Sequence, residues 1–392
     1  MADLKFDDLR KTYENFMDPK IKLIIGDKNV TDKDSPLAVT DMDVELTSGF
    51  EAGIATFRLV GAYDSDTKKF DISKCKDYIY LGSCVTISLG YATHVKRVFR
   101  GFIARVHFLI PRDSSEDIPS IEITAMDAKA SMMSNRHSKR LKATNYSDAV
   151  KEILDANVFI NTKDAKSKNY IKLVINDTPD KTSSQGQSGS SGSGASDVRV
   201  EMVEESEYEF IVKAAKKYNF EFFCTGKYMY FIEAKKNKDI LIELEPYEGI
   251  YSLDVGYDIT GLVRSVEVRN VESEKGEFIG KKEKLNSKIS MGNKAKQMVE
   301  AQSLVYLDPS AVTKEEAGYR LSYLKNMVDY RLGSIEVEMV GIPELTPGRF
   351  IQLKNTGRPV NNSFYLTRVR HSFTRSGYVT QIEGCANVIG SD

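Results

Sequence analysis

The side chains that could perform acid–base or nucleophilic chemistry are scattered along this sequence. Its four histidines lie in separate segments: His94, His107, His137 and His371. His371 stands in a predicted strand beside Arg370, which favours a packed or interface residue over a general base. Asp127 ends a predicted strand directly before a predicted helix, where capping the helix explains a carboxylate more simply than acid catalysis does.

The common catalytic and ligand-binding motifs are absent as well. The sequence contains no GxSxG, no HExxH, no phosphate-binding GxxxxGK loop and no dinucleotide-binding fingerprint. The four cysteines are scattered and form no CxxC pair: Cys75, Cys84, Cys224 and Cys385. This spacing predicts buried free thiols rather than a zinc site or a disulfide framework. We therefore predict no catalytic, cofactor-binding or metal-ligating residues.

The composition indicates a folded protein of several domains. The chain has 392 residues, which exceeds a single hydrophobic core and predicts roughly two to four domains. Its 55 basic and 56 acidic residues leave a net charge of −1, so no overall field favours nucleic acid or an anionic membrane. No apolar run is long enough to span a bilayer, and the first residues lack the layout of a signal peptide. We therefore expect folding in a cytoplasm, with no membrane anchor.

Hydrophobic periodicity divides the chain into four units, and the predicted fold class is α+β, mainly β. The units are an N-terminal helical arm at 1–19, a first β-barrel at 20–128, an α+β domain at 129–240 and a second β-barrel at 241–390. We expect the arm to pack on a neighbouring subunit. A flexible Ser/Gly loop at 182–197 has a composition that fits a natural loop or an engineered linker. A capping box at Thr313 predicts a helical insertion near 313–332.

Two distant stretches follow one pattern, which predicts an internally duplicated chain. In each stretch a glycine precedes a strand, a second strand carries an Arg-Val pair, and a third strand closes the unit. The first stretch contains Gly82, Val85, Ile87, Leu89, Phe102, Ile103, Arg105, Val106, Ile121 and Ile123, and the second contains Gly348, Ile351, Leu353, Tyr365, Leu366, Arg368, Val369, Val379 and Ile382. We expect two β-barrels of the same fold.

A helix and an aromatic hairpin form the centre of the predicted α+β domain. Apolar residues at helical spacing predict a helix over 208–218, and alternating aromatic residues on both sides of Gly226 predict the hairpin. Because alternate strand residues point to opposite faces, one face carries Phe223, Met229 and Phe231. Two interpretations of that face remain. In the first, the face is an exposed patch that seats a partner protein. In the second, another domain of the same chain covers the face.

Three segments resemble a known family, in the family's own order. They are ITAMDAKASMM at Ile123–Met133, YEFIVKAAKKYNFEFFCTGKYMYF at Tyr208–Phe231, and PGRFIQLKNTG, FYLTRVRHSF and GYVTQIEG within Pro347–Gly384. These segments resemble the hub domain of phage late control protein D and of type VI valine-glycine repeat spike proteins. The similarity spans roughly 20–388, and the three motifs together are more specific than any one of them.

The resemblance implies a structural baseplate hub of a contractile phage tail or related injection particle. Such hubs are similar to the tail-tube protein folded twice in one chain, so a homotrimer makes a ring of six barrels that adapts a six-fold tube to a three-fold spike. The implied partners are the tail-tube or tube-initiator protein and a spike protein, with tape-measure and baseplate wedge proteins as further candidates. The candidate residues for the spike or subunit interface are Phe223, Met229, Phe231, Arg368, Arg370 and His371.

The family also implies where the protein acts. Type VI spike proteins continue beyond the hub domain, whereas this sequence stops at Asp392, so we expect the spike on a separate chain. Assembly in the cytoplasm would be followed by a place in the virion tail baseplate or in an extracellular injection particle.

Two other classes of function remain open. A baseplate-associated cell-wall hydrolase would need a cleft with converging carboxylates. An adhesin built of β-domains would need an exported chain and a binding pocket at the loop tips. The missing signal sequence counts against the adhesin.

Overall fold

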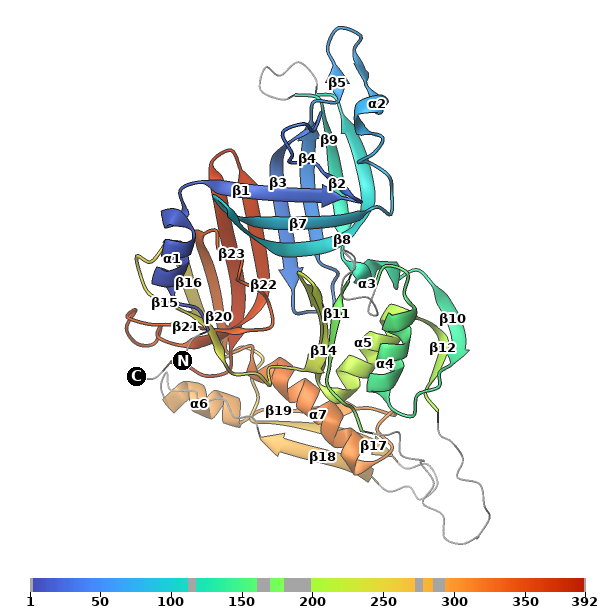
Figure 1. Ribbon diagram of the computed structural model, residues 1–392. Helices are drawn as coiled ribbons and strands as arrows, with labels where there is room; N and C mark the ends of the chain where they lie inside the picture. The colour runs from blue at the N-terminus through green and yellow to red at the C-terminus, as the bar shows by residue number, and fades with distance from the viewer. Residues whose placement is uncertain are drawn as a thin grey trace.

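Figure 1 shows the computed structural model of the chain, in which two β modules lie side by side above the helices α3, α4, α5 and α7. The structure describes residues 3–111, 118–160, 170–179, 199–271, 278–284 and 293–390. The Ser/Gly loop expected at 182–197 lies outside these ranges. The chain is mainly β, with two related β-barrel modules and a smaller α+β domain. Within the described ranges, no helix is long and apolar enough to cross a membrane.

The first module contains the strands that follow the N-terminal arm. Alternate apolar residues such as Leu23, Val85 and Ile123 are buried, because period-two alternation turns one side of each strand inward. Its elements are β1 (Pro19–Ile25), β2 (Lys28–Asn29), β3 (Ala38–Thr47), β4 (Ile54–Val60), β5 (Tyr63–Asp64), β6 (Lys69–Phe70), α2 (Ile72–Cys75), β7 (Cys84–Tyr91), β8 (His94–Leu109) and β9 (Ser120–Met126).

The second module is built in the same way from the later part of the chain. Its elements are β15 (Ile240–Leu244), β16 (Ile250–Tyr257), β20 (Gly333–Val340), β21 (Phe350–Leu353), β22 (Ser363–Thr374) and β23 (Gly377–Ala386). The strand order is β3-β4-β9-β8-β7-β1 in the first module and β16-β20-β23-β22-β21-β15 in the second. Neighbouring strands are antiparallel in both, except that β15 and β21 are parallel. The shared order is the one that internal duplication predicts.

The glycines of the sequence pattern occupy matching positions in the two modules. Gly82 precedes β7 with φ of +82°, and Gly348 precedes β21 with φ of +83°. This left-handed conformation favours glycine, which has no Cβ to collide with its own backbone. The amide of Gly82 donates to the carbonyl of Ile103, and the amide of Gly348 donates to that of Leu366, both at 2.9 Å. The same turn therefore introduces the same strand in each module.

The α+β domain has an apolar core of its own below the first module (Figure 1). Its two longer helices begin at side-chain caps, because Asn145 accepts the amide of Asp148 and Ser206 forms a capping box with Glu209. Its elements are α3 (Ala128–Ser131), β10 (Arg136–Arg140), α4 (Tyr146–Ala156), β11 (Lys172–Ile175), β12 (Glu201–Ser206), α5 (Glu207–Tyr218), β13 (Phe220–Thr225) and β14 (Tyr228–Glu233).

A small sheet and two helices are inserted between β16 and β20. The elements are β17 (Ser265–Val271), β18 (Phe278–Lys284), α6 (Asn293–Glu300), β19 (Ser303–Leu307) and α7 (Lys314–Asp329). Thr313 caps α7 by accepting the amide of Glu316 at 3.1 Å, as the sequence predicts. The insertion is larger than the helix expected near 313–332. It also contains α6 and the sheet β18-β17-β19, on which α7 packs. The lysine-rich β18 lacks the apolar alternation that would have revealed a strand.

The N-terminal arm packs on its own chain rather than on a neighbouring subunit, which corrects our expectation. It consists of α1 (Phe6–Thr12) and a 3₁₀ turn, η1 (Glu14–Phe16). Phe6 and Leu9 are buried in the core that the two modules share. The hydroxyl of Tyr13 donates to Glu344 at 2.6 Å. The second module therefore covers the apolar stripe of α1.

Candidate functional site

The two modules join along an antiparallel seam between β3 and β22. The register pairs Thr47 with Arg368 at one end of the seam and Met42 with Phe373 at the other. β3 thus has β4 on one side and β22 on the other over residues 42–45, so neither side of it is left unpaired there. The seam converts two separate sheets into one.

Ion pairs cross the seam on its polar face. Arg370 Nε donates to Asp43 Oδ1 at 3.0 Å, and Arg368 Nε lies 3.3 Å from Glu45 Oε1. Each pair is diagonal, since Arg370 stands directly opposite Glu45 and Arg368 opposite Thr47. Exposed pairs of this kind contribute only about 0–1 kcal/mol each. Their main effect is to favour one register over its neighbours.

The seam produces a continuous run of eight antiparallel strands with a free edge at each end. The order is β16-β20-β23-β22-β3-β4-β9-β8, four strands from each module. Among the residues that the structure describes, β16 has a strand partner on one side only, β20. β8 pairs with β7 through its first half and with β9 through its second, so residues 104–109 have one side without a strand partner in the described part of the chain.

Apolar side chains are exposed at both free edges. Phe108 and Ile110, at the β8 edge, are 45% and 60% exposed, and Tyr251 of β16 is 61% exposed. A strand edge with unpaired backbone groups and apolar side chains is a template for pairing with another chain. The two edges are therefore the strongest candidate interaction sites of the molecule.

The three apolar candidates of the hairpin lie inside the chain. Phe223, Met229 and Phe231 are at most 2% exposed. α5 packs against β13, and β13 also contacts β3 and β8 of the first module. Phe223 stacks on Tyr230 with ring centroids 4.8 Å apart. The same chain covers all three, and the expected exposed patch is absent at these residues. The expectation that they share one face is wrong, because Phe231 pairs with Phe222 and Met229 with Cys224, whereas Phe223 pairs with Tyr230 on the opposite face.

The charged candidates belong to the seam. Arg368 and Arg370 are part of β22 and face β3, not a free edge. His371 is fully buried, and its Nδ1 lies 2.8 Å from the hydroxyl of Tyr378 and 3.2 Å from Thr380 Oγ1. Burial lowers the pKa of His371 to about 4, so the imidazole is neutral at pH 7. His371 is a packed residue and not a base.

A buried ion pair joins the first module to the α+β domain. Asp127 caps α3, as predicted, by accepting the amides of Lys129 at 2.9 Å and of Gly53 at 2.7 Å. The Lys129 side chain is fully buried, with Nζ 3.9 Å from Asp127 Oδ2 and hydrogen-bonded to the carbonyls of Glu51 and Phe222. Burial raises the pKa of Asp127, and the Lys129 ammonium opposes that shift. Nothing in the sequence signals a buried lysine here.

A second buried network joins the hairpin to the second module. The carboxylate of Glu221 accepts the Tyr365 hydroxyl and lies 3.3 Å from Lys235 Nζ. The Lys235 ammonium also stands 5.0 Å and 4.8 Å from the ring centroids of Tyr330 and Tyr365. Burial raises the pKa of Glu221, and Lys235 opposes the shift. The charges satisfy one another, which fits a structural joint.

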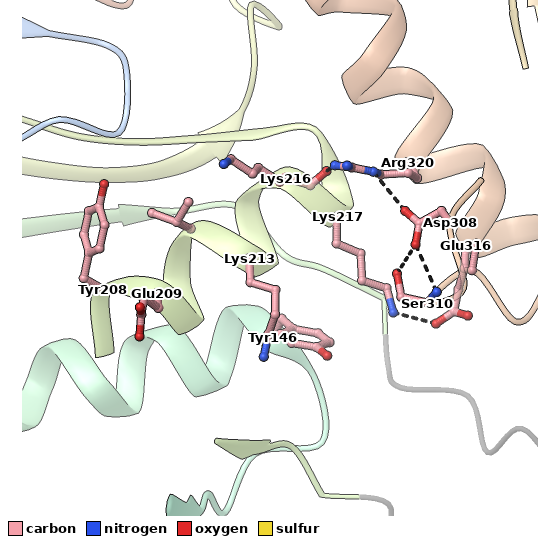
Figure 2. A pocket seen from close by; sticks show the side chains of 12 residues that line it. Tyr146, Tyr208, Glu209, Lys213, Lys216, Lys217, Asp308, Ser310, Glu316 and Arg320 are labelled. Carbon is pink, nitrogen blue, oxygen red and sulfur yellow. Dashed lines mark hydrogen bonds and ion pairs between the residues drawn. The ribbon is translucent and has the colours of Figure 1, made fainter. Parts of the chain in front are cut away.

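The cavity drawn in Figure 2 has a volume of about 620 Å³ and lies between α5 and α7. Lys217 Nζ is 2.6 Å from Glu316, and Arg320 Nε is 3.0 Å from Asp308 (Figure 2). Because a cation holds each of these carboxylates, neither is poised as the acid or nucleophile of a hydrolase. In the ranges that the structure describes, no group of His, Cys, Asp and Glu could hold a metal ion. The cavity fits a contact between domains.

Comparison with solved structures shows that the chain has the fold of phage tail proteins. A tail protein from Neisseria meningitidis matches with a TM-score of 0.63 at 9% identity, over 94% of this chain and 97% of that one. The 43 kDa tail protein of prophage MuSo2 from Shewanella oneidensis matches with a TM-score of 0.62 at 12% identity, over 93% and 98%. The fold is therefore shared along nearly the whole chain despite low identity.

A component of a type VI secretion system has a similar structure. This Escherichia coli protein, described as resembling the tail proteins gp27 and gp5 of bacteriophage T4, matches with a TM-score of 0.53 at 13% identity, over 95% of this chain and 77% of that one. No curated protein matches the sequence. A model of the Alg8 N-terminal domain matches residues 47–181, a span that starts in β3 and ends beyond β11, and so follows none of the units of this fold.

Proposed function

We propose that this protein is the structural baseplate hub of a contractile phage tail or a related injection particle. The observation that carries the proposal is the run of eight strands, four from each duplicated module, with a free edge at either end. Three copies in a ring would present six equivalent modules, which suits a six-fold tube on one side and a three-fold spike on the other. The tail and type VI proteins that share the fold support this role.

Ring closure accounts for the two edges. The edges differ from each other, so a contact between them is heterologous and generates a ring when the rotation between copies closes. In the closed ring, the free side of β16 in each copy would pair with the free part of β8 in the next copy. The exposed apolar side chains at these edges would be covered at the same time.

The hub would connect several other proteins. Its proposed partners are the tail-tube or tube-initiator protein and a spike protein on a separate chain, with tape-measure and baseplate wedge proteins as further candidates. It would assemble in the bacterial cytoplasm and then act in the virion baseplate or in an extracellular injection particle. Its proposed units are those of the sequence analysis: 1–19, 20–128, 129–240 and 241–390.

The proposal includes no catalytic activity of the chain itself. The buried charges at Asp127 and Glu221 are paired within the chain, and the carboxylates of the cavity in Figure 2 are held by Lys217 and Arg320. Such pairing fits residues that join domains better than residues that carry out acid–base chemistry.

Mass and symmetry measurements on the purified protein test the proposal. Native mass spectrometry is expected to give three times the chain mass of 44.0 kDa, and electron-microscopy class averages should show a ring of six similar lobes. A protein that remains monomeric at high micromolar concentration, or a ring with another number of chains, would contradict the trimeric hub.

A further inference from the structure

The seam within one chain contains the information needed to specify the contact between two chains. β22 and β8 are equivalent strands of the two modules, and both carry a register shift at the same place. In β8 the shift falls between Ile103 and Arg105, and in β22 it falls between Leu366 and Arg368. β22 pairs beyond this shift with β3 on one side, whereas the same part of β8 pairs with β9 but has no partner strand on the corresponding side in the described ranges. The β8 edge is thus the counterpart of a contact that the chain already makes once.

Cross-strand rows fix which residues of β16 correspond to those of β3. One row runs across β8, β9, β4 and β3 through Val106, Ile123, Phe57 and Met42. The matching row runs across β22, β23, β20 and β16 through Val369, Ile382, Val337 and Leu253. Each row starts at the valine of an Arg-Val pair and contains only apolar residues. Leu253 is therefore the counterpart of Met42, and the next residue, Asp254, is the counterpart of Asp43.

The register of the second contact follows from these equivalences. At the seam, Ser372 pairs with Asp43. Counting from the valine of each Arg-Val pair, Ser372 corresponds to Leu109. Resting on the trimer proposed above, we propose that residues 105–110 of one copy pair antiparallel with β16 of a second copy, in the register that places Leu109 opposite Asp254.

The chemistry of the facing residues agrees with this register. On one face it aligns Phe108 with Val255 and Ile110 with Leu253, so these two exposed apolar side chains meet apolar partners, while Leu109 on the other face stands opposite Asp254. A slip of one residue would place Phe108 or Ile110 opposite polar positions such as Asp254, because strand side chains alternate between faces. A slip of two residues, in contrast, would keep each side chain facing residues of the same face of β16.

The polar face of the proposed register repeats the layout of the seam. At the seam, Asp43 accepts from Arg370, which stands diagonally across from it. Asp254, the counterpart of Asp43, also has a carboxylate side chain, and His107 is the counterpart of Arg370. In the same register Arg105 stands directly opposite Asp258, so these two residues form a pair of opposite charge.

Cysteine cross-linking tests the register directly. A chain with Leu109→Cys and Asp254→Cys carries one half of the pair at each edge, so mild oxidation should link copies into a covalent trimer on a non-reducing gel. Opposite residues of paired strands lie within disulfide reach, whereas diagonal neighbours lie at about 7–8 Å and do not. We therefore expect at least ~10-fold more cross-linked product than for the control with Leu109→Cys and Ser252→Cys, which reports a two-residue slip.

The chain supplies its own positive control. Asp43→Cys with Ser372→Cys is the same pair at the seam, and oxidation should close it within one chain without linking copies. The unsubstituted protein controls for the native thiols. A trimer by native mass in which the Leu109 and Asp254 cysteines stay unlinked, or link less than the slipped pair, overturns the register alone. A protein that stays monomeric overturns the proposed hub and the register with it.

Discussion

At the scale of single residues, the most informative groups are polar side chains that the fold has buried. His371 makes the seam sensitive to pH, because its pKa is about 4 in the folded protein against 6.5 when unfolded. Between these values the unfolded chain binds more protons, so stability should fall as the pH is lowered from 6.5 to 4, by about 3 kcal/mol in total for this group. His371→Gln should flatten that part of the profile.

Urea denaturation measured from pH 4 to pH 7 checks this expectation. His94 is exposed at the start of β8, outside the proposed contact between copies, so His94→Gln serves as the matched control and should leave the profile unchanged. A His371→Gln variant with the same loss of stability between pH 6.5 and pH 4 as the unsubstituted protein would show that other groups dominate.

Lys129 is the second residue whose burial has a measurable consequence. Lys129→Met should destabilise the protein by roughly 3–5 kcal/mol, because it leaves the buried Asp127 without its cation. Adding Asp127→Asn should recover part of the loss, since no lone charge then remains. Lys151→Met, at an exposed position of α4, should change stability by no more than ~0.5 kcal/mol. Denaturant unfolding of these three variants and of the unsubstituted protein completes the comparison, and equal effects of Lys129→Met and Lys151→Met would argue against the buried pair.

At the scale of elements, the duplication offers a comparison in which one backbone turn occurs in two environments. Gly82 and Gly348 have the same φ, but a Cβ at Gly82 would meet nothing within 4 Å, whereas one at Gly348 would overlap the ring of Phe223. Gly82→Ala should cost about 1–2 kcal/mol for the left-handed conformation alone. Gly348→Ala should cost a further ~1–3 kcal/mol, because the ring must move in a packed core.

The difference between these two glycine variants can be read from their urea midpoints. It isolates packing from backbone strain, because the strain is common to both sites. Equal midpoints would mean that the Phe223 ring moves freely, and that the hairpin is packed less tightly against the second module than its burial indicates.

At the scale of the whole molecule, the duplicated fold with two free edges favours assembly over catalysis. We expect no clearing of bacterial cell walls in zymograms of the purified protein, because Glu316 and Asp308 in the cavity of Figure 2 are held by Lys217 and Arg320. A characterised cell-wall hydrolase on the same gel is the positive control. Clearing that a single carboxylate substitution, such as Glu316→Gln, abolishes would replace the structural interpretation with an enzymatic one.

Local chemistry was enough to predict several features from the sequence alone. Apolar alternation revealed β7, β8 and β9 of the first module and their repetition as β21, β22 and β23 of the second, because each strand buries every second side chain. Asp127 and Thr313 were predicted as caps, because the orphan amides at a helix start need an acceptor within a few residues. Gly82 and Gly348 marked the matching turns for the same local reason, since their conformation depends on their own backbone.

The tertiary structure decided what lies across from each surface. Alternation predicted that the hairpin has two apolar faces, but only the packing showed that Met229 and Phe231 lie in the core of the α+β domain and that Phe223 is buried on the opposite face. The burial of Lys129, the docking of α1 and the pairing of β3 with β22 depend likewise on contacts between segments far apart in sequence. A residue pattern specifies which side of an element is apolar, whereas the partner of that side is chosen by the free energy of packing the whole chain.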